Sequence, residues 1–586
     1  MNLKKISLIA VFAVMLFAVL LTPSFAAGNM DYANDAPGGT VTSADEFVAA
    51  LGSENAVKVS ETEIKLKNSI VLQKTIEITN GRYTLKSQGC IIYRGFEKGA
   101  LFFLNGSSLS QRPSLSLGVA STAMIEEGVE PNLTIDGCKD IYPKADGSLI
   151  MLKGGATLNV YGSTLLTNAL NTGMGGAVYA ELGEQSEVDY STPLEPTVLL
   201  RNCKIEKCSA DIAGGAVAFV GCYDGFNVGS LTVENVSFPV NTSVNETGTG
   251  AGGSIYSLGG TVNVATATFT ENIADNGAAV YIASEGRMSN ITAEYNTAKV
   301  SGGVVYVGAT NEVDGEVSIE NLVAHQNKSE GNGGVITNEG ILLGLSLYCT
   351  QNECALNGGG IYNTGVFEMK EGSFMNNDAG VSGGGAYCKG EKSVFILSGG
   401  EINSNESPFA GAIYSEGSVE INGGAVGRND SAEPHLVLKG KVVFGKNASV
   451  LGSNTIGLCI TESQNGNENI PYIELTGSST VLDYMYVGFF REKTDKDGNV
   501  TGYKMANKSG RSVFVGTEED IKNTEKWYIA YYRGPLSYVI NEDGTLSPRF
   551  IHLPIWAWFI IGPALGAGGF FGYKKIKPLI KNKKAK

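Results

Sequence analysis

The chain has 586 residues, of which 44 are basic and 59 acidic, so its net charge is −15 at neutral pH. Nine lysines lie at the two ends; between them remain 35 basic and 59 acidic residues, a net charge of −24. A surface this acidic repels nucleic acid, anionic lipid and polyanions of the teichoic-acid type, and it favours solubility over self-association.

Residues 1–27 are predicted to be a signal peptide. Lys4 and Lys5 form a basic start, and the stretch 6–21 is almost wholly apolar. The segment 24–26 then supplies small residues at the two positions that a signal peptidase reads, so we expect cleavage near Ala26 or Ala27. The apolar run is long for a signal peptide, so an uncleaved N-terminal anchor remains the alternative. A lipid anchor is not expected, because no cysteine lies near this site.

Residues 28–55 are predicted to be a lead and an N-terminal cap. Ser43 and Glu46 have the spacing of a capping box, which opens a short amphipathic run. We expect a helix over 43–51 that covers the open end of a repeat structure, because exposed strand edges promote aggregation.

A repeat dominates residues 56–436, with an insertion expected near 107–130. One element reads G-G-x-[IV]-Y and recurs at intervals of 25 residues, ending at Tyr256, Tyr281 and Tyr306, and again at Thr337, Tyr362 and Tyr387. A second element ends in Asn, usually three residues after an apolar residue. Its copies end at Asn241, Asn272, Asn296, Asn327, Asn352 and Asn377, with Asn168 and Asn405 assigned to equivalent places and Cys208 replacing the Asn once.

Between these two elements lies a shorter stretch in which apolar residues alternate, as in Val262-x-Val264 and Phe367-x-Met369. Three short strands in about 25 residues form one coil of a right-handed parallel β-helix, and successive coils stack about 4.8 Å apart. The chain lacks the leucine frame of a leucine-rich repeat and the longer period of a propeller blade. A flexible glycine-rich linker would not keep Tyr and Ile at a fixed period. The fold class expected is therefore all-β.

Each recurring residue type has a physical role in such a coil. Gly-Gly permits positive φ at a corner and close approach of neighbouring coils. Stacked Asn amides can form a ladder, and Tyr can stack on Tyr. We expect Asn296, Asn327, Asn352 and Asn377 to lie in register at one corner with buried amides.

The alternation of G-G-A-[IV]-Y and F-x-x-N over residues 164–424 resembles the passenger domains of the chlamydial polymorphic outer-membrane proteins. It is also similar to a wider set of β-helix adhesin-like surface proteins. The resemblance implies a β-helix with a role in adhesion. Those chlamydial proteins end in an outer-membrane barrel, whereas this chain is expected to end in a membrane helix, which favours the surface of a single-membrane cell.

Residues 437–550 are predicted to form a C-terminal β region and a stalk, in which 495–499 form a hairpin turn rather than a calcium loop. Residues 551–573 are predicted to form one transmembrane helix, since 555–573 carry no charge over a length that spans a bilayer. The basic tail 574–586 should remain cytoplasmic by the positive-inside rule. This topology places the ectodomain outside the plasma membrane of the cell.

No catalytic, cofactor-binding or metal-binding residues stand out in the sequence. Three histidines lie far from the cysteine pairs, which argues against zinc. The nine cysteines are expected to be core residues, with one or two disulfides left open. Asp211, Asp224, Asp275 and Asp378 are expected at unrelated corners, and no cofactor is expected.

The function expected is that of a membrane-anchored adhesin-like protein making multivalent contacts with a protein or glycan on a host or neighbouring cell. Nucleic acid is not expected as a partner. The alternative is a polysaccharide-binding or polysaccharide-degrading protein, a lyase or hydrolase on the same scaffold. Enzymatic activity is therefore left open, with its absence favoured. Acidic residues aligned at coil corners would favour the enzyme, and aromatic stripes in a groove would favour glycan binding.

Overall fold

The computed structural model describes residues 34–549, apart from 109, 121–128, 184–193, 224, 311–314, 433, 446, 452–454, 463–465, 477–480, 484–485, 518–536 and 542. The expected signal peptide, membrane helix and basic tail lie outside these residues. No helix within the described part is both long enough and apolar enough to cross a membrane.

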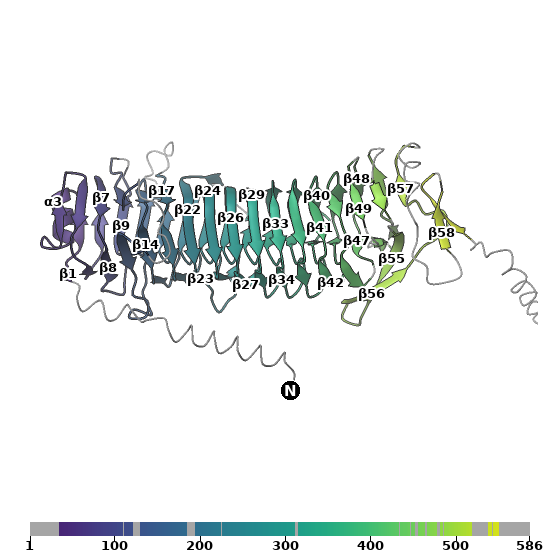
Figure 1. The fold of residues 1–586 in the computed structure, drawn as a ribbon, viewed down its shortest axis with the longest axis horizontal. Coiled ribbons are helices and arrows are strands. Elements are labelled where there is room, and N and C mark those ends of the chain that lie inside the picture. Colours follow the sequence, from purple (N-terminus) through teal and green to yellow (C-terminus); the bar gives the residue numbers. More distant parts are fainter. Residues whose placement is uncertain are drawn as a thin grey trace, which may run out of the picture.

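The described chain is all-β, with 56% of residues in strands and 2% in helix, which confirms the expected class. Strands one coil apart pair in parallel, so the molecule is an elongated stack of coils compatible with a β-helix or another solenoid (Figure 1). Each coil contributes strands to rows that run along the molecule.

The first row carries the G-G-x-[IV]-Y strands. It consists of β2 (Gly39–Val41), β6 (Ile76–Ile78), β9 (Phe102–Gly106), β12 (Ile150–Gly154), β16 (Val178–Glu181), β20 (Val217–Tyr223), β24 (Ile255–Thr270), β26 (Val280–Glu294), β28 (Val305–Val307), β31 (Ile336–Asn338), β35 (Ile361–Asn363), β39 (Ala386–Cys388), β43 (Ile413–Ser415), β47 (Leu436–Leu438), β50 (Thr455–Cys459) and β55 (Tyr486–Thr494).

The second row carries the short alternating strands. It consists of β4 (Glu63–Leu66), β7 (Arg82–Lys86), β10 (Ser114–Leu117), β13 (Thr157–Val160), β17 (Thr197–Arg201), β22 (Ser230–Pro239), parts of β24 and β26, β29 (Glu316–His325), β32 (Ile341–Gly344), β36 (Val366–Met369), β40 (Val394–Leu397), β44 (Ser418–Ile421), β48 (Val442–Phe444), β53 (Ile473–Leu475) and β57 (Phe514–Val515).

The third row precedes the Asn positions. It consists of β1 (Asn34–Ala36), β5 (Ile70–Leu72), β8 (Cys90–Arg94), β11 (Leu133–Asp136), β14 (Thr164–Thr167), β18 (Lys204–Glu206), parts of β22, β24, β26 and β29, β33 (Leu347–Thr350), β37 (Gly372–Met375), β41 (Glu401–Asn403), β45 (Ala425–Val426), β49 (Ser449–Leu451) and β54 (Val481–Asp483).

A fourth row follows the Asn positions and forms a separate parallel sheet of ten strands. It consists of β15 (Leu170–Asn171), β19 (Ser209–Ala210), β23 (Thr242–Ser243), β25 (Ile273–Asn276), β27 (Thr297–Ser301), β30 (Lys328–Ser329), β34 (Glu353–Cys354), β38 (Asp378–Ala379), β42 (Glu406–Phe409) and β46 (Asp430–Ala432). The expectation of three strands per coil was therefore wrong for these coils. Most of these strands are too short to show a period of two in the sequence.

The predicted repeat spacing is confirmed in the central coils, where Ile255, Val280 and Val305 are aligned, as are Ile336, Ile361 and Ala386. The parallel pairing also continues on both sides of the expected repeat boundaries. β1 and β2 lie before residue 56, and β50 and β55 extend the first row beyond residue 436.

Helix α3 (Ala44–Ala50) lies at the N-terminal end of the stack (Figure 1). Ser43 Oγ accepts a bond from the Glu46 N–H, and the Glu46 carboxylate accepts one from the Ser43 N–H, which confirms the capping box. Phe47 is buried and packs edge-on against Tyr83 and Phe102, with ring centroids 5.5 and 6.5 Å away. The helix therefore buries its apolar face against the first coils.

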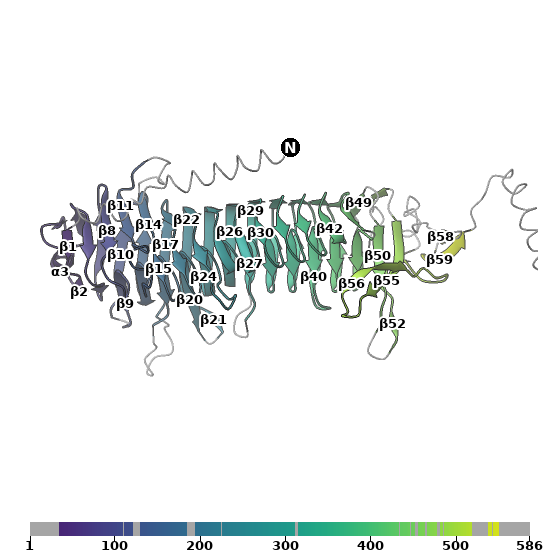
Figure 2. The same ribbon diagram turned by 90° about the horizontal axis from the view of Figure 1, so that it is seen from below.

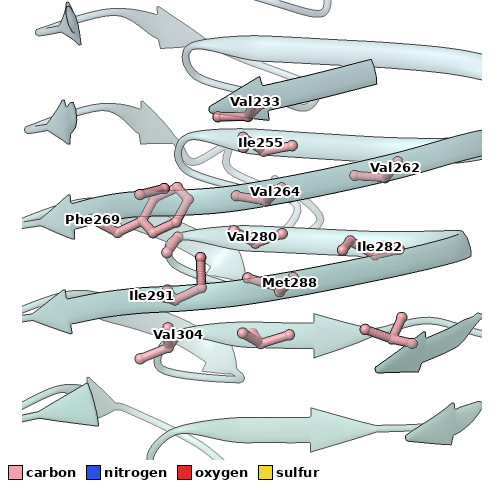
Figure 3. Packing of buried hydrophobic residues seen from close by; sticks show 14 of the residues in the cluster. Val233, Ile255, Val262, Val264, Phe269, Val280, Ile282, Met288, Ile291 and Val304 are labelled. Carbon is pink, nitrogen blue, oxygen red and sulfur yellow. The ribbon is translucent and has the colours of Figure 1, made fainter. Parts of the chain in front are cut away.

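Inward-facing side chains of successive coils form one continuous core. Val233, Val264 and Met288 lie on three consecutive coils and are fully buried (Figure 3). The rings of Phe238 and Phe269 stack with centroids 5.1 Å apart. Because this interior is filled by side chains, any binding site must lie on the outer surface or at the corners.

Antiparallel hairpins supplement the parallel rows. They pair β3 (Ala56–Lys58) with β4, β20 with β21 (Phe226–Asn227), β51 (Thr461–Glu462) with β52 (Glu468–Asn469), β55 with β56 (Val500–Met505), and β58 (Ser537–Ile540) with β59 (Leu546–Arg549). Figure 2 shows β21 and β52 standing off the body. The turn at 495–499 joins β55 to β56, as predicted, and Asp495 Oδ1 accepts bonds from the N–H groups of Asp497 and Asn499.

Candidate functional site

The Asn residues of the repeat form a buried ladder at one corner, as predicted. The Asn327 N–H and Nδ2 both donate to Asn352 Oδ1, at 2.9 and 3.0 Å, and Nδ2 also donates to the Ala293 carbonyl at 2.9 Å. Each side chain thereby joins the coil before it to the coil after it. The asparagine ladder, whose members are at most 3% exposed, consists of Asn241, Asn272, Asn296, Asn327, Asn352, Asn377, Asn405 and Asn429.

Of the two further residues that the sequence places at this corner, one is confirmed and one is wrong. Cys208 does occupy a ladder position, since its N–H donates to Asn241 Oδ1 at 3.0 Å. Asn168 does not, because Thr167 aligns with Glu206, which places Asn168 beside Lys207 and Ala169 beside Cys208. Asn168 instead has a positive φ, and its Nδ2 donates to Asp136. Asn tolerates this backbone region, so an Asn alone does not identify the ladder position.

A second buried polar group, the side chain of Arg94, forms hydrogen bonds with backbone carbonyl groups among the N-terminal coils. Arg94 is fully buried, and its guanidinium donates to the carbonyls of Gly99, Gly147 and Ser148 at 2.7–2.9 Å. Burial lowers the pKa of Arg94 to about 10. Nothing in the sequence marks this arginine, because it belongs to no repeated element.

The tyrosines of the first row stack along the outer surface and line a groove. The rings of Tyr256, Tyr281 and Tyr306 lie 5.2 and 4.9 Å apart, and those of Tyr362, Tyr387 and Tyr414 lie 5.5 and 4.6 Å apart. The tyrosine row comprises these six residues, and Thr337 separates its two halves. Each ring covers the face of its neighbour, so the row presents ring edges and hydroxyl groups. Burial raises the pKa of each tyrosine hydroxyl in the row.

Carboxylates are aligned along the fourth row, on its outward face. We call Glu353, Asp378, Glu406 and Asp430 the acid row; all four are exposed, and they occupy the same position on successive coils. Asp378, expected at a corner unrelated to those of Asp211, Asp224 and Asp275, aligns with Glu353, Glu406 and Asp430 instead. Looking for aspartates that share a position on successive coils does not reveal this row, because Asp378 aligns with two glutamates, Glu353 and Glu406.

The acid row borders two adjoining surface grooves that share Asp378. One, of about 470 Å³, is lined by Asp378, Glu406, Pro408, Asp430 and Ser431, among others. The other, of about 490 Å³, is lined by amide, acidic and basic side chains, including Gln326, Lys328, Gln351, Glu353 and Asp378. Partial burial raises the pKa of Asp378, and the neighbouring carboxylates of Glu406 and Glu353 raise it further. Lys328 lies at the N-terminal end of this row, 3.9 Å from Glu353.

The remaining aspartates considered from the sequence have local roles or lie outside the described residues. Asp275 is buried and accepts bonds from the N–H groups of Asn245 and Gly250, so it holds the loop between them. The Asp211 carbonyl accepts a bond from Asn245 Nδ2 in the same loop. Asp224 is not among the described residues.

All nine cysteines lie in the described part of the chain, and none is in a disulfide. Eight are buried, and burial raises the pKa of Cys203 and of Cys208 to about 12, so neither thiol is a reactive thiolate near neutral pH. Across the described ranges, no three His, Cys, Asp or Glu side chains are grouped so that they could hold a metal ion.

The candidate functional surfaces are therefore two outer rows that repeat from coil to coil, the tyrosine row and the acid row. No protein-family model, curated protein or solved structure matches the chain. The proposal of function consequently rests on these side chains and on how they recur.

Proposed function

We propose that the chain is a membrane-anchored, cell-surface adhesin-like protein that makes multivalent contacts through a right-handed parallel β-helix. Its location is inferred from the sequence features of residues 1–27 and 551–573, which predict an ectodomain outside the plasma membrane. The resemblance to the chlamydial surface proteins supports the same role. The partner is a protein or glycan on a host or neighbouring cell.

The observation that carries this proposal is the recurrence of one kind of outward side chain on consecutive coils. Four aligned carboxylates form the acid row, and three stacked tyrosines form each half of the tyrosine row. A partner with a repeating structure can engage several equivalent positions at once. Many weak contacts on one rigid body then act together, so the overall affinity exceeds that of any single contact.

The acid row also indicates the charge of the surface that it would contact. Lys328 lies near Glu353 alone, and within the described part of the chain Asp378, Glu406 and Asp430 form no ion pair. Basic or neutral hydroxyl-rich surfaces fit these grooves, whereas polyanions would be repelled. Binding to a basic partner should therefore weaken as the ionic strength rises.

A coil-deletion series tests the proposal with the full chain displayed on cells. We first identify a ligand with a screen of glycans and cell-surface proteins, then measure cell binding after removing residues 336–360, and after removing 336–385. Binding should fall in steps as coils are lost. Asp378→Asn should reduce it only slightly, with Glu371→Gln, outside the acid row, as the matched control. Complete loss of binding from one folded point variant would contradict the multivalent model.

The alternative, a polysaccharide-binding or polysaccharide-degrading protein, is favoured by one specific feature of the acid row. Asp378 and Glu406 lie on adjacent coils, whose strands are about 4.8 Å apart, near the ~5–5.5 Å between the carboxyl groups of retaining glycosidases. The raised pKa of Asp378 is what a general acid requires. The carboxylates also line a groove open to solvent, as a polymer would need.

Release of reducing ends or unsaturated products from a polysaccharide panel separates these two functions. In the enzyme model, Asp378→Asn and Glu406→Gln should each lower turnover by a factor of about 100 or more. In the adhesin model, neither wild type nor variants should release product, and binding should persist in both variants.

A further inference from the structure

The groove beside the tyrosine row has a second wall that runs along most of the stack. This wall is a line of residues on successive coils. Single-residue β-bridges pair its members with one another, and the pairing of β25 with β27 continues the line. It begins at Met174 and continues through Ala213, Ala251, Asn276, Ser301 and Asn332, and it resumes at Asn357, Ser382 and Phe409. We call it the bridge row. The two walls therefore flank the tyrosine row both near its beginning and near its end.

At the C-terminal end, a side chain of the molecule itself fills this groove. Tyr503, from the hairpin of β55 and β56, packs against the buried cluster of Ala410, Tyr414, Val437 and Cys459. Its ring meets Phe409 edge-on, with centroids 5.8 Å apart and planes at 80°. The groove here thus accepts an aromatic ring presented by an antiparallel hairpin.

Polar contacts hold that hairpin in place around the ring. The Tyr414 hydroxyl donates to Glu492 Oε1 at 3.2 Å, and Lys439 Nζ lies 2.9 Å from the same carboxylate. Lys439 Nζ also lies 4.9 Å from the centroid of the Tyr414 ring. The hairpin therefore combines an inserted aromatic ring with a charged anchor at the edge of the groove.

Nearer the N-terminus, the same groove is open. A hollow of about 320 Å³ lies there between Tyr256, Tyr281 and Tyr306 on one side and Met174, Ala213, Ala251 and Asn276 on the other, with Ile212 and Thr249 completing the lining. The two sides of this hollow belong to the tyrosine row and the bridge row. Further along the same rows, Tyr414 and Phe409 lie on either side of Tyr503. The hollow is small for a ligand site and suits a side chain better than a polymer.

The molecule also carries an exposed aromatic hairpin that is not inserted anywhere in the described part of its own chain. Tyr223 and Phe226 pair across the hairpin of β20 and β21, and they are 39% and 69% exposed. Phe226 is the most exposed of the large hydrophobic residues that the structure describes. Figure 2 shows this hairpin projecting from the body. An exposed apolar tip of this kind is typical of a contact surface.

We propose that the hairpin tip of one copy, through Phe226, docks into the open part of the tyrosine groove of a second copy. This contact would copy the one that Tyr503 makes within the chain. In both, an aromatic ring on a hairpin is inserted between the tyrosine row and the bridge row. Tip and hollow are different surfaces, so each copy offers one of each. The two contacts can close into a symmetric dimer or continue into a chain of copies.

Self-association of the purified full chain tests this proposal, measured by light scattering and sedimentation equilibrium up to about 100 µM. Phe226→Ala should weaken the association by about tenfold or more. Ala251→Phe should have a similar effect by filling the hollow, and Phe409 shows that the bridge row accepts this side chain. Tyr348→Ala is the matched control, because Tyr348 is an exposed aromatic residue outside both surfaces. Association should strengthen with salt, since the net charge of −15 opposes it.

Photo-cross-linking identifies the contact directly. A benzoylphenylalanine at position 226, in a mixture of isotopically labelled and unlabelled chains, should cross-link between chains to the segments around Met174 and Ile212. Ala213→Met, which copies the aligned Met174, replaces Ala251→Phe if circular dichroism shows that the latter misfolds. A monomeric wild type at the highest concentration, cross-links elsewhere, or capture of a different protein at this position would each overturn the proposal.

Discussion

The coils from residue 255 to 430 and those from 76 to 217 share the first three strand rows but close their corners in different ways. In the first region most coils repeat after 25 residues, and at every coil an asparagine of the ladder makes the same kind of hydrogen bonds at the corner. In the second, Phe102 pairs with Ile150 and Ile150 with Val178, so a long coil is followed by a much shorter one. There Arg94 alone satisfies three carbonyl groups.

This difference determines how far a disturbance spreads. A ladder member depends only on its two neighbours, so the regular region behaves as a sum of similar units. Arg94 joins the Gly99 carbonyl to that of Ser148, which belongs to the next coil and lies far along the sequence. Its loss should therefore affect these two coils together. Regular coils should be interchangeable, whereas the N-terminal coils should not.

Deleting a coil should produce the largest contrast. Removal of residues 336–360 joins Val335 to Ile361, keeps the register and brings Asn327 beside Asn377, so cooperative unfolding should persist with a modest change in Tm. Removal of residues 336–347, about half a coil, should abolish cooperative unfolding, because it shifts the register of the following strands and turns their apolar faces outward.

The same experiment on the N-terminal coils completes the comparison. Deleting residues 150–174 should also abolish cooperative unfolding. Ile150 aligns with Val178, so this deletion stops short of a whole coil. A deletion of the length that the regular region tolerates would thus break the register here. Thermal unfolding measures all three variants, and equal tolerance in both regions would contradict the comparison.

Replacing the buried arginine should have the next largest effect. Arg94→Met leaves three carbonyls without their donor, which should lower the free energy of unfolding by about 3 kcal/mol or more. Arg82→Met, at an exposed position in the neighbouring strand β7, should change it by less than about 0.5 kcal/mol. Denaturant titration gives both values, and a small effect at Arg94 would show that water replaces its bonds.

A single ladder substitution should cost less, because only one link is lost. Asn352→Ala removes donors and an acceptor from the buried corner and should destabilise the protein by about 1–3 kcal/mol. Asn376→Gly is the matched control: Asn376 is exposed with φ 54°, a conformation that glycine adopts without strain. Denaturant titration compares the two variants. Near-neutral effects of Asn→Ala at several ladder positions would refute the role assigned to the ladder.

The smallest effect should come from the acid row. The pKa of Asp378 is raised in the folded state, so the folded protein binds this proton more tightly than the unfolded chain does. Stability should therefore fall as the pH rises through the interval between the unfolded and the folded pKa, and remain lower above it. Asp378→Asn should remove this component and stabilise the protein at pH 7 by less than about 1 kcal/mol. Denaturant titrations at several pH values test this, and a destabilised Asp378→Asn variant would contradict it.

Features that repeat one residue type at a fixed spacing could be predicted from the sequence, and so could the local capping box, whereas features that occur once or mix residue types could not. Tyr256, Tyr281 and Tyr306, like the ladder from Asn241 to Asn405, can be aligned because coils of equal topology place equal residues in register. Ser43 and Glu46 are recognisable because a capping box is local. Arg94 is not, because its partners come from loops whose approach depends on the insertion that follows it.

The acid row, Asn168 and the contact of Tyr503 lie beyond this limit. The acid row mixes Asp with Glu and lies on strands that are mostly very short, so neither composition nor alternation reveals it. Asn168 has the residue type of a ladder member, but its position one residue earlier requires a positive φ. The filled groove at Tyr503 brings β56 beside coils that lie much earlier in the chain, a contact that no local pattern encodes.

The polarity of the asparagine ladder has a mechanical consequence. Every ladder amide is oriented the same way, and its bonds run between coils. A force that pulls the two ends apart would load these links one coil after another. Each regular coil that opened would release a slack of about 85 Å of extended chain, while the remaining coils stayed folded. A stack built in this way would yield in steps under tension and dissipate work at each step, as a tether between two moving surfaces must.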